Sequence, residues 1–103
     1  MRVIYNNVIP FKGYKAINLF GIVFARCWLT LGDLNHEAIH TQQMKEMLYV
    51  FFYIAYICEW VYNLIKYRDT KLAYYEISFE REAYEHQTDM RYLRTRKHFA
   101  QYR

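Results

Sequence analysis

The chain has 103 residues, enough for one domain with a modest core but too few for a separate substrate-binding lobe. Its formal net charge of +4 is mild and no nucleic-acid-binding motif accompanies it, so we expect no nucleic-acid partner. Apolar residues make up 54% of the chain, with 12 Tyr but only 3 Gly and 1 Pro, which excludes a disordered or low-complexity chain. Cys27 and Cys58 lie outside any CxxC motif, which favours reduced thiols in a cytoplasmic protein over a disulfide framework.

The strands are predicted near the start of the chain. Residues 2 to 5 (RVIY) predict a first short strand. Residues 14 to 20 and 22 to 28 are rich in β-branched and aromatic side chains, and Gly21 separates them, so they predict a tight antiparallel hairpin or one strand with a bulge. Turn-forming residues mark three further places: Asn6 and Asn7, residues 10 to 13, and Gly32 with Asp33. A helix follows, which Asp33 or Asn35 can cap.

Residues 34 to 67 contain no Gly or Pro, and we predict that they are helical. Residues 34 to 46 mix polar and apolar side chains, as in a helix with one side on a cleft. Residues 47 to 65 are apolar nearly all round, so they must be buried in protein or in lipid. They are about long enough to span a bilayer, but Glu59 would be costly there. We therefore expect a buried core helix, with membrane association through residues 47 to 65 as the alternative.

A final helix is predicted over residues 79 to 97, with Ser78 as its N-cap. Its acidic residues come early and its basic residues late, which is the arrangement that the helix dipole favours. We therefore attribute the basic end of the chain to this helix rather than to a surface for nucleic acid or anionic lipid. The basic residues at this end are Arg91, Arg94, Arg96, Lys97 and Arg103.

Residues 36 to 40 read H-E-x-x-H, a motif whose side chains can bind a metal ion and activate a water molecule. Residues four apart lie on one face of a helix, so His36 and His40 can each offer a nitrogen to one zinc ion at about 2.0 to 2.1 Å. Glu37 projects beside them and can act as a general base on a water molecule that the metal activates. With the His and Glu content of this chain, an H-E-x-x-H motif would occur by chance somewhere in it with a probability on the order of one in a hundred. The alternative is an exposed helix that happens to carry two histidines.

These residues resemble the active-site helix of the zincin metallopeptidases. Residues 79 to 84 (FEREAY) resemble the E-x-x-A element of gluzincin-type families, in which a glutamate on a second helix is the third zinc ligand. The resemblance implies Zn²⁺ as cofactor, Glu80 as third ligand, and a peptide or protein as substrate. It also implies that an edge strand, here within residues 17 to 26, aligns the substrate beside the active-site helix. The whole chain resembles a group of small bacterial H-E-x-x-H proteins.

The third ligand has rivals among the other glutamates. Glu82 and Glu76 lie close to Glu80 in the sequence. Glu46 follows His36 by ten residues, where metzincins place their third ligand. Those families need a glycine where this chain has Gln43, and a continuing helix would point Glu46 roughly 80° away from His36. We therefore rank Glu80 first.

Two further residues have candidate supporting roles. Gln43 lies about one helical turn beyond His40 and is placed to hold that ring in position. Tyr84 lies one turn from Glu80 and is placed to donate a hydrogen bond to a developing oxyanion. Since the chain has 12 tyrosines, packing is the alternative role of Tyr84.

The position of Glu80 after the apolar stretch constrains the path of the chain. If residues 47 to 65 crossed a bilayer once, His40 and Glu80 would end about 30 Å apart or more and could not share a metal ion. A straight helix from His40 to Tyr67 would be about 40 Å long, a distance that about 13 extended residues only just cover on the return. We therefore predict a bend near residues 48 to 54 or an extended return through residues 68 to 78.

The sequence as a whole predicts one α+β domain, a minimal zincin-like domain over residues 1 to 103. An antiparallel hairpin within residues 2 to 28 packs on an active-site helix and two further helices. The leading function is zinc-dependent hydrolysis of peptide bonds. One alternative is a catalytically idle zinc-binding protein, and another is a small membrane-associated protein with an incidental motif. The aromatic excess is also compatible with a homodimer through an exposed apolar surface.

Overall fold

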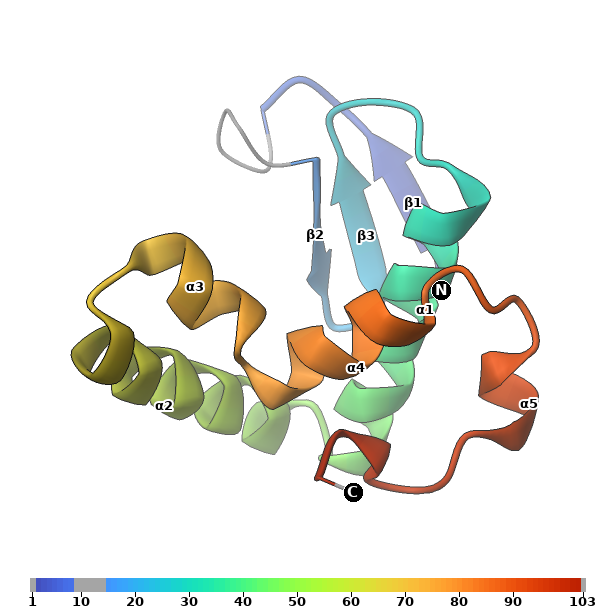
Figure 1. Ribbon diagram of the computed structural model, residues 1–103. Coiled ribbons are helices and arrows are strands. Elements are labelled where there is room, and N and C mark those ends of the chain that lie inside the picture. Colours follow the sequence, from blue (N-terminus) through green and yellow to red (C-terminus); the bar gives the residue numbers. More distant parts are fainter. Residues whose placement is uncertain (1, 9–14, 103) are drawn as a thin grey trace.

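The computed structural model describes residues 2–8 and 15–102, which form a small α+β domain as the sequence predicts. In chain order the elements within these residues are β1 (Arg2–Tyr5), β2 (Ala16–Leu19), β3 (Ile22–Ala25), α1 (Leu31–Glu46), α2 (Val50–Tyr67), α3 (Thr70–Tyr75), α4 (Ser78–His86), α5 (Tyr92–Thr95) and a final 3-10 turn, η1 (Ala100–Tyr102). Figure 1 shows the sheet at the top with α1 beside it, α2 and α3 together at the lower left, and α4 between these two parts.

The predicted hairpin is present, in a sheet of order β1-β3-β2. β2 and β3 pair antiparallel, with Leu19 opposite Ile22, and a two-residue turn at Phe20 and Gly21 joins them. Both turn residues have positive φ, 55° and 89°, which two-residue hairpins need and which glycine adopts without strain. β1 pairs parallel with β3, so β3 is the central strand and β2 is an edge strand that contacts α1. The turn predicted over residues 10 to 13 lies outside the described residues.

α1 begins earlier than predicted, at Leu31, so the predicted turn at Gly32 and Asp33 is wrong. Thr30 is the N-cap. Its hydroxyl accepts a hydrogen bond from the Asp33 amide at 3.1 Å, and the Asp33 carboxylate accepts one from the Thr30 amide at 3.0 Å. This reciprocal capping box satisfies two amides that the helix would otherwise leave free. Asp33 also pairs with Lys15 at 2.9 Å, which ties the start of α1 to the residue that precedes β2.

The chain bends by 111° between α1 and α2, which confirms the bend predicted near residues 48 to 54. Leu48 and Tyr49 make the bend with positive φ values of 54° and 60°. Such sparsely populated conformations cost on the order of 1 to 3 kcal/mol for each residue with a side chain. Burial of apolar side chains offsets this cost, because the bend lets both helices contribute to one core. The buried members of that core are Met44, Phe52, Ile77 and Phe79.

α2 is not the buried core helix that the sequence predicts. Among its side chains only Phe52 and Asn63 are buried. A chain of this size has too little other surface to cover an apolar helix on all sides, so α2 packs on α3 and the core with one face and leaves the other exposed. Within the described residues no single helix combines the length and the hydropathy needed to cross a membrane. α1 and α2 pass that test as a bent pair, by length and composition alone.

The helix predicted over residues 79 to 97 is shorter than expected, since α4 ends at His86. The Asn35 side chain of α1 donates hydrogen bonds to the carbonyl groups of His86, Gln87 and Asp89 at 2.9 to 3.1 Å. His86 is the last residue of α4 and Gln87 is its C-cap, so two of these bonds go to carbonyl groups at the end of the helix. Asn35 therefore stabilises the end of α4 rather than the start of its own helix.

Ser78 is the first residue of α4 and not its N-cap, which is Ile77. The Ser78 amide and hydroxyl both donate to the carboxylate of Glu59 on α2, each at 2.9 Å. A carboxylate at a helix N-terminus is stabilised by the free amides and the helix dipole there. The one acidic residue of the apolar stretch thus has a structural partner within the protein.

The segment after α4 folds back onto α1 instead of continuing as a helix. The Arg96 side chain is only 3% exposed and lies between Glu46 of α1 and Glu82 of α4. Its Nη1 is 2.8 Å from Glu46 and its Nη2 is 2.9 Å from Glu82, and Nε also contacts Glu82. The interpretation of Arg96 as a base in the last turns of a long helix is therefore wrong, because this side chain links three segments through buried ion pairs.

Arg96→Met is expected to lower the free energy of unfolding by about 3 to 5 kcal/mol, because it leaves two buried carboxylates without their cation. Chemical denaturation followed by circular dichroism measures the change. Arg94→Met is the matched control, since Arg94 is an exposed residue of α5 and its loss should change stability by less than about 0.5 kcal/mol. A loss below about 1 kcal/mol for Arg96→Met would contradict the structural role of these ion pairs.

Candidate metal centre

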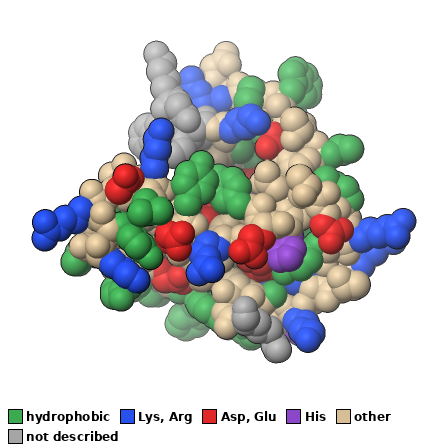
Figure 2. Space-filling view, viewed as in Figure 1, with side chains coloured by type: hydrophobic (Ala, Val, Ile, Leu, Met, Phe, Trp, Pro, Cys, Tyr) green, Lys and Arg blue, Asp and Glu red, His purple; other side chains and the backbone are tan. Residues whose placement is uncertain are grey.

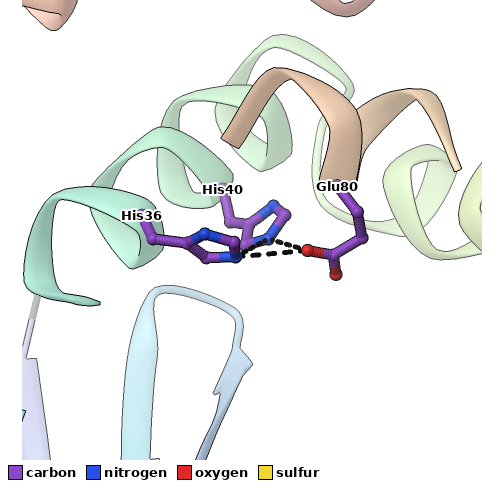
Figure 3. Close-up of side chains that lie close together, drawn as sticks. All are labelled: His36, His40 and Glu80. Carbon is purple, nitrogen blue, oxygen red and sulfur yellow. Dashed lines mark hydrogen bonds and ion pairs between the residues drawn. The ribbon is translucent and has the colours of Figure 1, made fainter. Parts of the chain in front are cut away.

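Three side chains from two helices meet inside the protein. α1 supplies His36 and His40, one turn apart, and α4 supplies Glu80 from the other side (Figure 3). The Glu80 Oε1 atom lies 3.2 Å from His36 Nε2 and 3.0 Å from His40 Nε2, and the two nitrogens are 3.1 Å apart. All three residues are buried. The structure therefore brings together the three residues that were predicted to share a metal ion.

The shape of this group fits a metal ion. Its three facing atoms form a triangle with sides of 3.0, 3.1 and 3.2 Å. Ligand atoms of a tetrahedral zinc ion, at bond lengths of about 2.0 to 2.1 Å, lie roughly 3.3 Å from one another. One ion could therefore bind all three atoms at ordinary distances and keep a fourth position open. Two imidazole nitrogens and a carboxylate oxygen suit zinc and several other first-row metals, so this is a group able to bind a metal ion.

Gln43 holds the ring of His40 from behind. The Gln43 Nε2 atom donates to the Phe79 carbonyl at 3.0 Å and to Glu82 at 2.9 Å, so Oε1 is the atom that faces His40 Nδ1 at 2.8 Å. An amide oxygen only accepts hydrogen bonds, so Nδ1 carries a proton and Nε2 is the nitrogen free to bind a metal. The structure thus places Gln43 in contact with His40, where the sequence predicted it.

Two residues that support the site, Gln87 and Tyr56, were not predicted from the sequence. Gln87 Oε1 lies 2.8 Å from His36 Nδ1, and the Tyr56 hydroxyl donates to Glu80 Oε2 at 2.6 Å. Gln87 follows Glu80 by seven residues, about two helical turns, so its position on the same face was readable from the sequence. Tyr56 is one of several tyrosines in the apolar stretch. Only the bend before α2 brings Tyr56 to Glu80, so the separation of these two residues in the sequence could not predict their contact.

Gln87→Leu is expected to weaken metal binding by about 10- to 100-fold, the usual cost of removing a hydrogen bond that orients a histidine ligand. Competition with a chromophoric chelator measures the dissociation constant. Gln42→Leu is the matched control, because Gln42 is exposed on α1. Equal affinities for the two variants would show that Gln87 does not orient His36.

Electrostatics couple His40 to Glu80. Burial alone would lower the pKa of His40, but the charge of Glu80 and the hydrogen bond to it raise that pKa from 6.5 to about 9. Burial likewise favours neutral Glu80, but His40 and the hydrogen bonds from His36, His40 and Tyr56 hold its pKa below the ordinary value of 4.5. In the metal-free protein the two groups therefore form an ion pair at neutral pH.

This ion pair predicts how the stability of the metal-free protein depends on pH. The His40 contribution, on the order of a few kcal/mol, is complete below pH 6.5 and is lost as the pH rises through about 9. The Glu80 contribution is complete above pH 4.5 and is lost as the pH falls below that value. Urea unfolding of chelator-treated protein should show a decline from pH 6.5 to 9, and zinc-loaded protein should not. Equal declines in both preparations would contradict the pairing.

Glu37 is buried beside this group, with 8% of its surface exposed. Burial raises the pKa of its carboxyl group, although the charges of His40 and His36 lower it. Within residues 2–8 and 15–102 its Oε2 atom has no hydrogen-bond partner. Leaving such an atom unpaired costs about 1 to 3 kcal/mol or more. Perturbed and poorly satisfied acids of this kind cluster at functional sites.

Tyr84 packs against the group but its hydroxyl is bonded elsewhere. Its ring lies 4.5 Å from the His36 ring, centroid to centroid, in an edge-on arrangement. Its hydroxyl is 3.3 Å from that of Tyr74. Burial raises the pKa of Tyr84 to about 12, so the hydroxyl keeps its proton at neutral pH and is able to donate. The structure places this tyrosine next to the site, and its part in any reaction stays a prediction.

The rival third ligands do not reach the histidines. Glu82 and Glu46 both pair with Arg96, as described above. Glu76 lies at the end of α3, and among the described residues the metal-binding group consists of His36, His40 and Glu80 alone. The remaining histidines are elsewhere: His86 stacks on Tyr92 with ring centroids 3.8 Å apart, and the His98 side chain is exposed near Glu46.

The strand predicted to align a substrate is only partly at an edge. β3 is central, so residues 22 to 25 cannot pair with another chain. β2 is the edge strand, and its Asn18 side chain donates to the Glu37 carbonyl at 3.0 Å, which fixes the strand to α1. The Tyr53 hydroxyl donates to the Asn18 carbonyl at 3.0 Å and accepts from the Phe20 amide at 2.9 Å. Tyr53 therefore already occupies two main-chain groups of this edge.

The fold and the site together define a class of protein: a small α+β domain with a buried group of two histidines and one glutamate that is able to bind a metal ion. The motif helix provides the histidines and a separate helix provides the glutamate. None of the protein-family models, curated proteins or solved structures that were compared with this chain matches it.

Proposed function

We propose that this protein is a zinc-dependent peptidase in which His36, His40 and Glu80 bind the ion. The observation that carries the proposal is the position of Glu80 Oε1, 3.0 and 3.2 Å from the two Nε2 atoms. Three protein ligands of these types, with a fourth position open, are the pattern of catalytic rather than structural zinc sites. The resemblance of residues 36 to 40 and 79 to 84 to zincin motifs supports the same reading.

In this proposal Glu37 is the general base. Zinc, when bound, would act as a Lewis acid that lowers the pKa of a water molecule and polarises a substrate carbonyl. Glu37 would accept the proton of the attacking water and deliver it to the leaving amine. Its raised pKa suits this exchange, because a general base works best when its pKa approaches the working pH. Tyr84 would donate a hydrogen bond to the developing oxyanion.

The substrate class that we propose is an extended peptide or protein segment. The edge of β2 would offer main-chain groups for pairing, as in other cases of strand addition. Because Tyr53 holds the Asn18 carbonyl and the Phe20 amide, the substrate would pair nearer Ala16, at the other end of the strand. The free, exposed thiols of Cys27 and Cys58 support a reducing compartment, the cytoplasm, as the place where it acts.

A metal-dependent cleavage assay tests this proposal. The purified protein is loaded with one equivalent of zinc and incubated with a peptide library, and products are read by mass spectrometry. We expect cleavage that a chelator abolishes and that added zinc restores. A fully zinc-loaded protein that cleaves no peptide or protein in a broad screen would overturn the peptidase and leave metal binding intact.

A catalytically idle zinc-binding protein is the second candidate. The contacts of Tyr53 favour it, since they occupy the strand edge that a peptide substrate would use. In that case the metal would hold α1 and α4 together and stabilise the fold. Zinc would then raise the midpoint of thermal unfolding without any turnover.

A further inference from the structure

One face of α2 presents a continuous apolar stripe to the outside. Its members share the helical spacing of three or four residues and are 45% to 74% exposed. We call this stripe the outer α2 face, and it consists of Val50, Ile54, Ile57, Val61 and Ile65. None of these side chains belongs to the hydrophobic core or packs against it. Exposed apolar surfaces of this kind on soluble domains mark sites of interaction.

The opposite face of α2 holds the polar contacts of this helix. Tyr56, Glu59 and Asn63 bind Glu80, Ser78 and the Ala73 carbonyl, respectively. These contacts fix the rotation of α2, so the outer α2 face cannot turn inward without breaking them. The stripe is therefore a property of the folded state.

Basic residues gather at the end of α2 that meets α3, just beyond Ile65, the last member of the outer α2 face. Lys66, Arg68 and Lys71 are all exposed there. The one acidic residue among them, Asp69, accepts hydrogen bonds from the amides of Lys71 and Leu72 as the N-cap of α3. Figure 2 shows basic side chains at this end of the molecule and hydrophobic side chains along the lower margin, the region of α2 in Figure 1.

We propose that the outer α2 face binds the surface of a bilayer that contains anionic lipids, with α2 parallel to the membrane plane. An exposed apolar helix face with lysine and arginine close to it is the pattern of helices that lie in the interfacial region. Exposed aromatic side chains beside the stripe, Trp60 and Tyr62, suit the boundary between acyl chains and headgroups.

Charge decides against a second copy of this chain as the occupant. A dimer through the outer α2 face would offer these basic residues no acidic partner, because α2 exposes no acidic side chain. An anionic lipid surface is complementary to the same residues.

Membrane binding in this orientation would place the metal-binding group close to the lipid. Tyr56 contacts Glu80 from the face of α2 opposite the stripe. A helix with its side chains is about 10 Å across, so the group would lie roughly that far above the surface. The membrane proposal does not rest on peptidase activity, since neither the stripe nor the basic residues beyond it belong to the metal-binding group.

Vesicle flotation tests the proposal with the full chain. One set of vesicles contains phosphatidylcholine alone and the other contains about one third phosphatidylglycerol. We expect binding to the anionic vesicles and at least about tenfold weaker binding for Ile57→Ser/Val61→Ser, which removes apolar area from the stripe. Leu31→Ser/Met90→Ser, two exposed apolar residues outside α2, is the matched control and should bind like the unchanged protein. Lys66→Gln/Lys71→Gln should weaken binding roughly 25-fold, about fivefold for each charge.

Two further measurements separate the outcomes. In a Trp28→Phe background Trp60 is the remaining tryptophan, and its emission should shift to the blue on anionic vesicles. Sedimentation velocity without lipid gives the oligomeric state. Absence of vesicle binding by folded protein would overturn the proposal, and so would equal binding by the stripe variant and its control. A dimer that Ile57→Ser/Val61→Ser dissociates would overturn it in favour of a second copy. Zinc content is measured in every preparation, so failure of the metal site is detected independently.

Discussion

Glu37→Gln is expected to abolish peptide hydrolysis and to leave one zinc ion bound per chain. The amide has nearly the shape of the carboxylate but cannot accept a proton, so the variant removes general-base catalysis, worth about 10²- to 10⁴-fold in rate. Glu37 is outside the group that can hold the metal, so affinity should change little. The variant also removes a buried charge whose Oε2 has no partner among the described residues, so stability should be equal or higher.

Glu85→Gln on α4 is the matched control for this variant, because the Glu85 side chain is 65% exposed and lies outside the metal-binding group. Turnover is measured with the best peptide from the cleavage screen, and zinc by elemental analysis of the same samples. Unchanged turnover in Glu37→Gln would exclude Glu37 as the base. Loss of zinc together with turnover would show instead that Glu37 helps to hold the metal.

Removal of one ligand from either helix is expected to reduce zinc binding by two to three orders of magnitude. Structural zinc sites with four protein ligands bind with about 10 to 16 kcal/mol, so one ligand contributes roughly 3 to 4 kcal/mol. His36→Ala removes a ligand from the motif helix, and Glu80→Gln removes the carboxylate from α4. Both variants should lose most of their zinc on dialysis.

The Glu80 variant is the sharper test, because it probes the part of the site that lies outside the motif. His98→Ala and Glu85→Gln are controls on exposed side chains and should keep one zinc ion per chain. If Glu80→Gln keeps its zinc at unchanged affinity, the third ligand is another group and the proposed site is wrong. If no preparation takes up zinc, the motif is incidental.

Structure that forms between residues close together in the sequence was predicted correctly. The hairpin around Gly21 was predicted because β-branched strands and a glycine are local signals. The pairing of His36 with His40 on one helix face follows from helical periodicity alone. The bend after α1 was predicted from chain geometry, since Glu80 had to return to the histidines.

Three of the wrong predictions concern contacts between distant segments. α4 ends at His86 because Asn35, 51 residues earlier, binds its last carbonyl groups, and no local signal marks that end. Arg96 lies outside any long C-terminal helix because its side chain binds two buried carboxylates, those of Glu46 and Glu82. α2 was expected to be buried because its composition is apolar, but burial depends on how much other surface the chain can place over it.

By itself the sequence determined which functional groups lie close together on the motif helix: the imidazoles of His36 and His40 and the carboxylate of Glu37. It also determined that residues 47 to 65 are apolar and therefore unfavourable to expose to water. Only the tertiary structure decided which of four glutamates completes the group, which glutamine holds the ring of His36, and which face of α2 stays exposed. The physical reason is that periodicity specifies side chains along one helix, whereas the distance between helices depends on packing over the whole chain. Here the bend at Leu48 and Tyr49 sets that packing and brings Tyr56 to Glu80.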